Sequence, residues 1–240
     1  MMVINAENLD FKTLNELVRA CEGDCAITNC RGQRFIAAGA PKRDIVIEGT
    51  PGNALGAYLN GARITVRGNA QDAVGDTMND GVIVIHGSVG DTAGYAMRGG
   101  RIYVKGGAGY RAGIHMKAYR EKLPVMVIGE TAGSFLGEYQ AGGIIIVLDK
   151  SRSGRPIVSN FPGTGMHGGK MFLRSDCKNI LFPPQVKTRP ATSGDLSEIE
   201  PYLREFCQYF GDDFASLSSG AFTVVTPDSS NPYHQMYVEN

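Results

Sequence analysis

The sequence has no tryptophan, no net charge and no long apolar run. Lysine plus arginine and aspartate plus glutamate each number 24, so no overall positive field favours nucleic acid or an anionic membrane. The longest apolar run, residues 144–148, is far shorter than the roughly 18 residues of a membrane helix. The N-terminus also lacks the basic and apolar regions of a secretory signal. We therefore expect a cytoplasmic protein that binds neither nucleic acid nor membrane.

Cysteine is scarce as well. The five cysteines are an odd number scattered through 240 residues, which is typical of free thiols in a reducing compartment rather than of a disulfide framework. Cys21, Cys25 and Cys30 have the spacing C-x3-C-x4-C, which raises the alternative of a metal or iron–sulfur site. No fourth ligand lies nearby, and we expect Cys21 on the apolar face of a helix and Cys25 at the start of a strand. Buried thiols are therefore the favoured interpretation, and we expect no cofactor or metal on this chain.

Glycine, by contrast, is abundant, with 32 residues, and its spacing reveals an internal repeat. Two sets of glycines recur every 19 residues, and the second set follows the first by seven positions. They are Gly49, Gly68, Gly87 and Gly106, continued by Gly129, and Gly56, Gly75, Gly94 and Gly113, continued by Gly137. We expect them to form corners where the backbone has positive φ or packs closely.

Apolar residues follow the same 19-residue period. Within each unit they alternate with polar neighbours such as Glu48 and Arg67, and a period of two predicts a half-buried strand. The two inward columns are Ile45, Ile64, Ile83, Ile102, Val125, Ile145 and Met171, and then Ile47, Val66, Ile85, Val104, Val127, Val147 and Leu173. A second strand is predicted around Leu55, Val74 and Ala93. We therefore expect an all-β fold, a right-handed single-stranded parallel β-helix of about seven coils.

The segments that flank the repeat are expected to cover its two open ends, because unpaired strand edges invite aggregation. The predicted regions are residues 1–44, with a capping helix and first strand, 45–182, with the β-helix, and 183–240, with an extended and helical tail. Asp10 is expected to cap the first helix, which plugs one end and stops near Gly23.

The C-terminal tail is expected to hold a second helix. Asp195 and Glu198 are predicted to form its capping box, Pro201 to split or kink it, and Gly211 to end it. Its apolar face would lie on the last coil or on another protein. Residues 227–240 show little periodicity and are expected to be ordered only by a partner.

Catalytic constellations are hard to find in the repeat. The four histidines show no paired metal-ligand spacing, and aspartates such as Asp72, Asp76 and Asp91 do not share one column, as the carboxylates of a carbohydrate-active β-helix would. The glycine runs lack a GK[ST] ending and are interpreted as corners rather than phosphate loops. We therefore expect no catalytic residue.

Residues 49–87 and 90–116 closely resemble the GxGxG-repeat domain that ends the large subunit of glutamate synthase. The resemblance covers roughly residues 45–173, and it extends to formylmethanofuran dehydrogenase, in which a related β-helix forms a separate chain. The flanking stretches NCRGQRFI and EFCQYFG resemble the stand-alone version found where the glutamate synthase large subunit is split into separate polypeptides. In that family the amidotransferase domain uses an N-terminal cysteine, and the synthase domain binds FMN and a three-iron cluster through C-x5-C-x4-C.

The resemblance implies a non-catalytic scaffold of an enzyme that makes glutamate from glutamine and 2-oxoglutarate. FMN and the iron–sulfur cluster are then expected on partner subunits, because this chain begins Met-Met and its cysteine spacing differs. The implied partners are a glutamine amidotransferase subunit and an FMN-binding synthase subunit, and a homo-oligomer is an open alternative. The other functional alternatives are a formylmethanofuran dehydrogenase scaffold and an independent carbohydrate-active enzyme.

Two insertions interrupt the 19-residue period, at 116–124 and 149–163, and both are basic. Insertions in solenoids form surface loops, often on a binding face. We therefore predict that they form one partner interface, with solvated loops as the alternative. The candidate interface residues are Lys117, Arg120, Lys122, Arg152 and Arg155.

Overall fold

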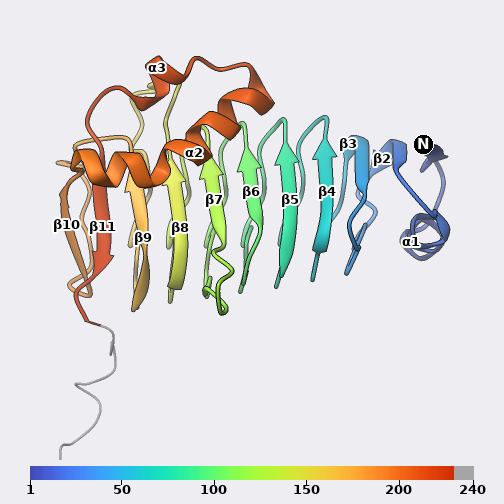
Figure 1. Cartoon of the computed structure of the whole chain (residues 1–240), viewed down its shortest axis with the longest axis horizontal. Helices are drawn as coiled ribbons and strands as arrows, with labels where there is room; N and C mark the ends of the chain where they lie inside the picture. The colour runs from blue at the N-terminus through green and yellow to red at the C-terminus, as the bar shows by residue number, and fades with distance from the viewer. Residues whose placement is uncertain (230–240) are drawn as a thin grey trace, which may run out of the picture.

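The computed structural model describes residues 1–229 and shows a parallel β-helix whose strands stack side by side in one eleven-stranded sheet (Figure 1). The nine parallel strands are β1 Met2–Asn5, β2 Cys25–Arg31, β3 Asp44–Thr50, β4 Asn60–Val66, β5 Asp80–Ile85, β6 Arg101–Val104, β7 Val125–Ile128, β8 Ala141–Val147 and β9 Gly168–Leu173. They make about eight turns. The predicted β-solenoid is confirmed, and it is longer than expected because β1 and β2 stack on the repeat although they precede it.

The register of the strands corrects the predicted columns at β7. Ile102 pairs with Met126 and Val104 with Ile128, instead of the predicted Val125 and Val127. Met126 and Ile128 are fully buried. The predicted columns allowed one residue too few for the five-residue insertion before β7. Val125 and Val127 therefore point to the outer face instead.

The predicted second strand is wrong. Leu55 and Val74 are fully buried, but both lie in turns. A second ladder does exist, but it lies four residues before the predicted column in each coil. It consists of single β-bridges that connect Ala70, Val89, Ala108, Ala132 and Val158. A turn forms at Leu55 and Val74 because the glycine that follows each has a left-handed backbone, which interrupts an extended conformation.

The N-terminal end is closed by α1 (Phe11–Ala20), which lies beside β1 and β2 (Figure 1). Asp10 caps it as predicted, accepting the backbone N–H groups of Lys12 and Thr13 at 2.8 and 2.9 Å. Leu14 and Val18 face the core, at 0% and 1% exposed. The helix ends at Ala20 rather than near Gly23, because the backbone of Cys21 is already extended, with φ −71° and ψ 118°.

The C-terminal end is closed by two antiparallel strands that the sequence did not predict. Strand β11 (Thr223–Pro227) pairs with β9, and β10 (Val186–Pro190) pairs with β11 and forms the sheet edge. Residues 227–229 therefore need no partner to be placed, and residues 230–240 of the predicted tail lie outside the described residues.

Between β10 and β11 lie α2 (Ser193–Phe210) and α3 (Phe214–Ser218). The capping box of α2 joins Thr192 and Asp195, one turn before the predicted pair of Asp195 and Glu198, and the helix runs unbroken through Pro201. Gly211 ends it as predicted, with φ 73°. Within residues 1–229, the helices are all too short or too polar to cross a bilayer.

Candidate partner surfaces

Helix α2 covers the outer face of the C-terminal coils and crosses the strands from the β10 end toward the middle of the sheet (Figure 1). Its residues Ile199, Leu203 and Phe206 are at most 1% exposed. They pack on the outward side chains Val82, Val84, Tyr103, Val125, Val127, Ile144, Ile146 and Phe172. The apolar face of this helix is therefore buried against several coils of its own chain, rather than on the last coil alone.

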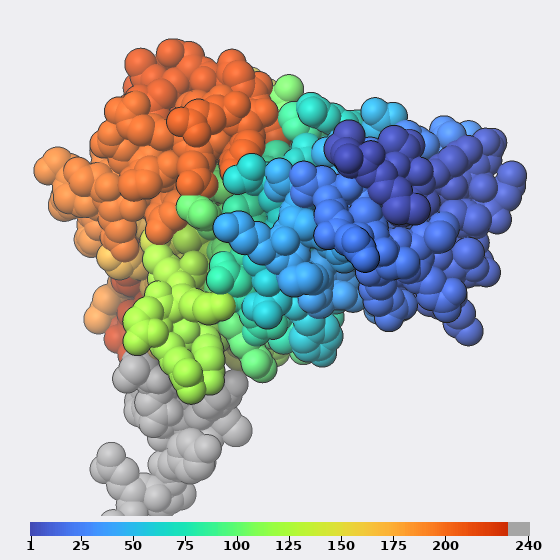
Figure 2. Space-filling view, turned by 45° about the vertical axis from the view of Figure 1, so that its right-hand side comes forward, coloured from blue at the N-terminus to red at the C-terminus, as the bar shows by residue number. Residues whose placement is uncertain are grey.

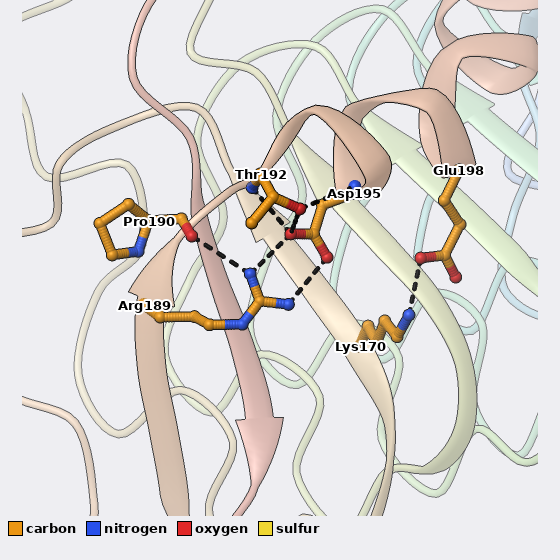
Figure 3. A network of polar contacts seen from close by, with 6 residues as sticks. All are labelled: Lys170, Arg189, Pro190, Thr192, Asp195 and Glu198. Carbon is orange, nitrogen blue, oxygen red and sulfur yellow. Dashed lines mark hydrogen bonds and ion pairs between the residues drawn. The ribbon is translucent and has the colours of Figure 1, made fainter.

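Polar contacts fix the start of α2. At its start, Arg189 of β10 holds Asp195 through two hydrogen bonds of 2.6 and 2.8 Å, and Lys170 of β9 bonds Glu198 at 2.6 Å (Figure 3). Hydrogen bonds from Arg189 lower the pKa of the Asp195 carboxyl, although burial opposes this shift.

A second polar cluster lies two turns further along α2. Glu205 accepts hydrogen bonds from Arg101, at 2.6 Å, and from the hydroxyl of Tyr103. Tyr103 is fully buried, and burial together with Glu205 raises the pKa of its phenol. The helix is thus an integral part of the solenoid surface.

The first insertion lies directly before β7, on the side of the solenoid where the strands begin. Lys122 forms an ion pair with Asp80 at 3.2 Å and donates to the carbonyl of Asn79 at 3.3 Å, which ties the loop to β5. Lys117 and Arg120 are exposed. In Figure 2 this insertion, coloured light green, projects from the lower side of the molecule.

The second insertion follows β8, where the strands end, and lies against α3. Lys150 pairs with Asp212 at 3.2 Å, and Ser151 donates to Glu130 at 2.6 Å. Arg152 and Arg155 are exposed. Because β7 and β8 are parallel neighbours, a loop before β7 and a loop after β8 lie at opposite ends of the strands. The two insertions therefore do not form one patch, and their role in partner binding stays a prediction for each loop separately.

The corner glycines fall into two groups. Gly56, Gly75, Gly94, Gly113 and Gly137 have φ between 63 and 70°, and a Cβ on Gly94 would lie 2.3 Å from Cε of Met126 inside the solenoid. Gly68, Gly87, Gly106 and Gly129 lack positive φ but pack on the preceding coil, where a Cβ on Gly129 would lie 2.2 Å from the carbonyl oxygen of Lys105. Gly49 has both features, with φ 111° and 2.2 Å to the carbonyl oxygen of Cys30.

The three cysteines of the C-x3-C-x4-C motif are buried, and His86 packs against an aromatic ring. Cys21, Cys25 and Cys30 are buried free thiols, and burial raises the pKa of Cys25 and of Cys30 to about 11, so neither is a reactive thiolate. His86 packs edge-on against Phe210. Within residues 1–229, no group of three or more metal-ligating side chains occurs.

One surface was not predicted from the sequence, and we call it the left-handed corner. It is a five-residue turn, repeated in seven coils, whose first, third and fifth residues all have positive φ; the turns begin at Phe35, Ala54, Ala73, Thr92, Arg111, Phe135 and Phe161. Six large aromatic side chains are exposed in residues 1–229, namely Phe35, Tyr58, Tyr95, Tyr110, Tyr119 and Phe161. All but Tyr119 lie on or directly beside this corner. Aligning the repeat for exposed columns, as well as buried ones, would have found it.

The rings on the corner contact one another along the solenoid axis. Phe135 lies between Tyr110 and Phe161, with ring centroids 5.3 and 5.2 Å away, and His115 stacks on Tyr139 at 5.2 Å. Arg111 covers the Tyr110 ring and pairs with Glu138 at 2.7 Å. Aromatic and arginine side chains are enriched at the centres of protein interfaces, so the corner is a candidate docking surface.

Comparisons with known proteins define the class of this chain. The GXGXG motif family matches residues 19–227, and the chain belongs to that family, which confirms the resemblance predicted from the repeat. MJ1350, an uncharacterised protein of Methanocaldococcus jannaschii, is 41% identical over 250 aligned positions that cover 98% of this chain and 96% of MJ1350.

A solved structure shares the fold. A chain from the formyltransferase/hydrolase complex FhcABCD of Methylorubrum extorquens, determined with methylofuran, superposes with a TM-score of 0.62 over 92% of this chain and 89% of that one. The two sequences are 20% identical, so this similarity describes the architecture.

Proposed function

We propose that this chain is the non-catalytic scaffold subunit of a split glutamate synthase, on which a glutamine amidotransferase subunit and an FMN-binding synthase subunit assemble. The observation that carries the proposal is the family match over residues 19–227. In glutamate synthase the resembling domain supports the catalytic domains rather than reacting itself. FMN and the iron–sulfur cluster would then reside on the synthase subunit.

The interior of the solenoid supports a structural role. The inward positions of successive coils are filled by fully buried apolar residues, from Ile45 through Ile83 to Met171, and both ends are closed by added elements. Such a packed interior offers rigidity rather than a substrate channel. A rigid body with three separate surface features, the two insertions and the left-handed corner, suits a chain that positions other subunits.

Reconstitution tests the proposal. The chain is co-expressed with the amidotransferase and synthase subunits of the same genome, and the mass of the complex is measured by light scattering. We expect a stable assembly that contains this chain, and glutamine-dependent glutamate synthesis that requires it. Failure of both subunits to bind the wild-type chain would contradict the proposal.

A second candidate is a scaffold subunit like that of formylmethanofuran dehydrogenase, which is favoured by the superposition on a chain of the FhcABCD complex. The two candidates differ in their partners. A native complex whose other subunits carry molybdopterin would favour the second candidate, whereas FMN in the complex would favour the first. Turnover by the isolated chain would support neither and would point to an independent enzyme.

A further inference from the structure

A cavity of about 600 Å³ lies at the N-terminal end of the solenoid, between α1 and the first two turns of the left-handed corner. We call it the α1 cavity. Phe11, Asn15 and Arg19 line it from the helix, and Phe35 and Tyr58 line it from the coils. The helix that closes the solenoid therefore leaves a hollow along the line where it meets the coils.

Two polar side chains in the wall of the α1 cavity have unused hydrogen-bonding capacity. Asn15 is only 8% exposed. Its amide nitrogen donates to the carbonyls of Phe11 and Arg34 at 2.7 and 2.9 Å, whereas its oxygen has no donor among residues 1–229. Arg43 donates to the Cys21 carbonyl at 2.7 Å, but its Nε is buried without a partner in the same part of the chain. Because a buried N–H without a partner costs free energy, the Arg43 guanidinium is incompletely compensated.

The α1 cavity is positively charged, although the whole chain has no net charge. Lys12, Arg19 and Arg43 line it, and Glu16 is the acidic residue in its wall. Within residues 1–229 none of these four side chains forms an ion pair. The cavity therefore favours an anionic occupant, and carboxylates are the acceptors that guanidinium groups bind most strongly in proteins.

Aromatic rings form the apolar part of the α1 cavity. The Phe11 and Phe35 rings lie 6.1 Å apart, and the guanidinium of Arg34 lies 4.9 and 6.0 Å from their centroids. Phe35 and Tyr58 stay 44 and 58% exposed. Small-molecule sites enclose most of their ligand, whereas these two rings remain accessible to an occupant that extends beyond the cavity. The arrangement fits a segment of another protein better than a free small anion.

We propose that the α1 cavity docks an acidic segment of a partner subunit, in which a large apolar side chain lies between carboxylates. The apolar side chain packs against Phe11 and Phe35, and the carboxylates pair with Arg19 and Arg43. This inference rests on the proposed scaffold function, because it requires a partner subunit, and it adds the chemistry by which one partner is recognised.

Two substitutions test the cavity without removing any of its packed side chains. Lys12→Glu reverses an exposed charge in the first turn of α1, where the helix dipole favours an acidic residue. Ala38→Glu places a carboxylate at an exposed position in the cavity wall. The matched control is Lys178→Glu, at a side chain that is 81% exposed and follows β9 at the other end of the solenoid. All three variants should keep a Tm close to that of the wild type.

A peptide titration measures the recognition directly. The probe is an acetylated and amidated peptide with one phenylalanine between two pairs of glutamates, and its control has glutamine in place of every glutamate. By isothermal titration calorimetry on the full chain, we expect the acidic peptide to bind at least about tenfold more tightly than the neutral one and to weaken with added salt. Lys12→Glu and Ala38→Glu should each weaken the acidic peptide at least about tenfold, and Lys178→Glu should not.

Assembly with whole subunits extends the test. Each variant is co-expressed with the amidotransferase and synthase subunits, and at least one subunit should bind the two cavity variants about tenfold more weakly than it binds the wild type and Lys178→Glu. A wild-type chain that binds neither subunit would contradict the proposed function, and the peptide titration would still decide the inference.

Lack of binding by the acidic peptide at millimolar concentration would overturn the inference. So would equal binding of the acidic and neutral peptides, or equal losses in the cavity variants and the control. If submillimolar succinate or inorganic phosphate bound the chain and displaced the peptide, the cavity would be a small-anion site and the inference would be wrong. Subunit assembly that is unaffected by both cavity variants would place the docking surface elsewhere and overturn it as well.

Discussion

The outer faces of β3 and β4 differ from those of β7 and β8, although the four strands share one stacked register. On β3 and β4 the outward residues Val46 and Thr65 are half-buried and Arg63 is exposed. On β8 the corresponding Ile144 and Ile146 are 2% and 0% exposed beneath α2. The interior columns of the two regions are equally buried.

This difference shows that different contacts constrain the inward and the outward positions of the repeat. Inward positions keep the solenoid stacked and are apolar in every coil, because every coil must cover its neighbour. Outward positions vary with what covers them, from solvent over β3 to the apolar face of α2 over β7. The covered region should therefore depend on α2 for stability, whereas the uncovered region should not.

The largest expected effect is loss of the α2 contact. Phe206→Ala removes a fully buried ring and should lower the free energy of unfolding by about 4 kcal/mol, since large-to-small changes in a core leave a cavity. Urea denaturation measures this. Val46→Ala at the uncovered face is the comparison, a smaller truncation of a half-buried side chain, and should cost less than about 1 kcal/mol. Equal losses at both positions would contradict the division between covered and uncovered coils.

The middle glycine of the left-handed corner should be sensitive to substitution, because a side chain there would enter the interior of the solenoid. Gly75→Val combines a β-branched residue at φ 68° with a Cβ 2.6 Å from Cδ1 of Ile102, and we expect about 3 kcal/mol of destabilisation from strain and overpacking. Gly39 has a similar φ of 67° but open surroundings, so Gly39→Val should show the smaller loss due to strain alone. A Gly75→Val melting temperature near that of the wild type would refute the packing argument.

The repeat predicted the interior well because its signal is copied in every coil. The columns of Ile45 and Ile47 and the corner glycines needed only a period of 19 residues, and one insertion sufficed to misplace Val125 and Val127 by one position. The end strands β10 and β11 were missed because each occurs once and follows no period. Strand β11 pairs with both β9 and β10, and the whole of α2 and α3 separates it from them in the sequence.

The surface was predicted less well for a physical reason. Lys122 and Arg152 are both basic and lie in neighbouring coils. Membership of neighbouring coils, however, does not predict at which end of its strand each loop lies. The left-handed corner was missed because Tyr58, Phe135 and Phe161 are apolar residues outside the strand pattern.

A smaller effect concerns the pH dependence of the α2 contact. The pKa of Tyr103 is raised in the folded state by burial and by Glu205, so its neutral phenol stabilises the fold at neutral pH. As pH rises above about 10 the unfolded state loses this proton while the folded state retains it, and stability falls. Tyr103→Phe should cost about 1.5 kcal/mol at pH near 8, and its difference from the wild type should shrink above about pH 10. A constant difference in Tm across this range would contradict the assignment.

The smallest effect on stability is expected at the exposed arginines of the second insertion. Arg152→Glu combined with Arg155→Glu changes two exposed side chains and should leave Tm unchanged, because exposed charges contribute little to folding. If this loop docks an acidic partner subunit, the double variant should slow assembly with the amidotransferase and synthase subunits, and added salt should reduce the difference, because charges at the rim of an interface act mainly on the association rate. Stopped-flow association at two ionic strengths measures this, with Lys117→Glu in the first insertion as the comparison. Since the two loops lie at opposite ends of the strands, each variant should impair a different partner; unaltered assembly in both would assign docking to the surface around α2 and the tail.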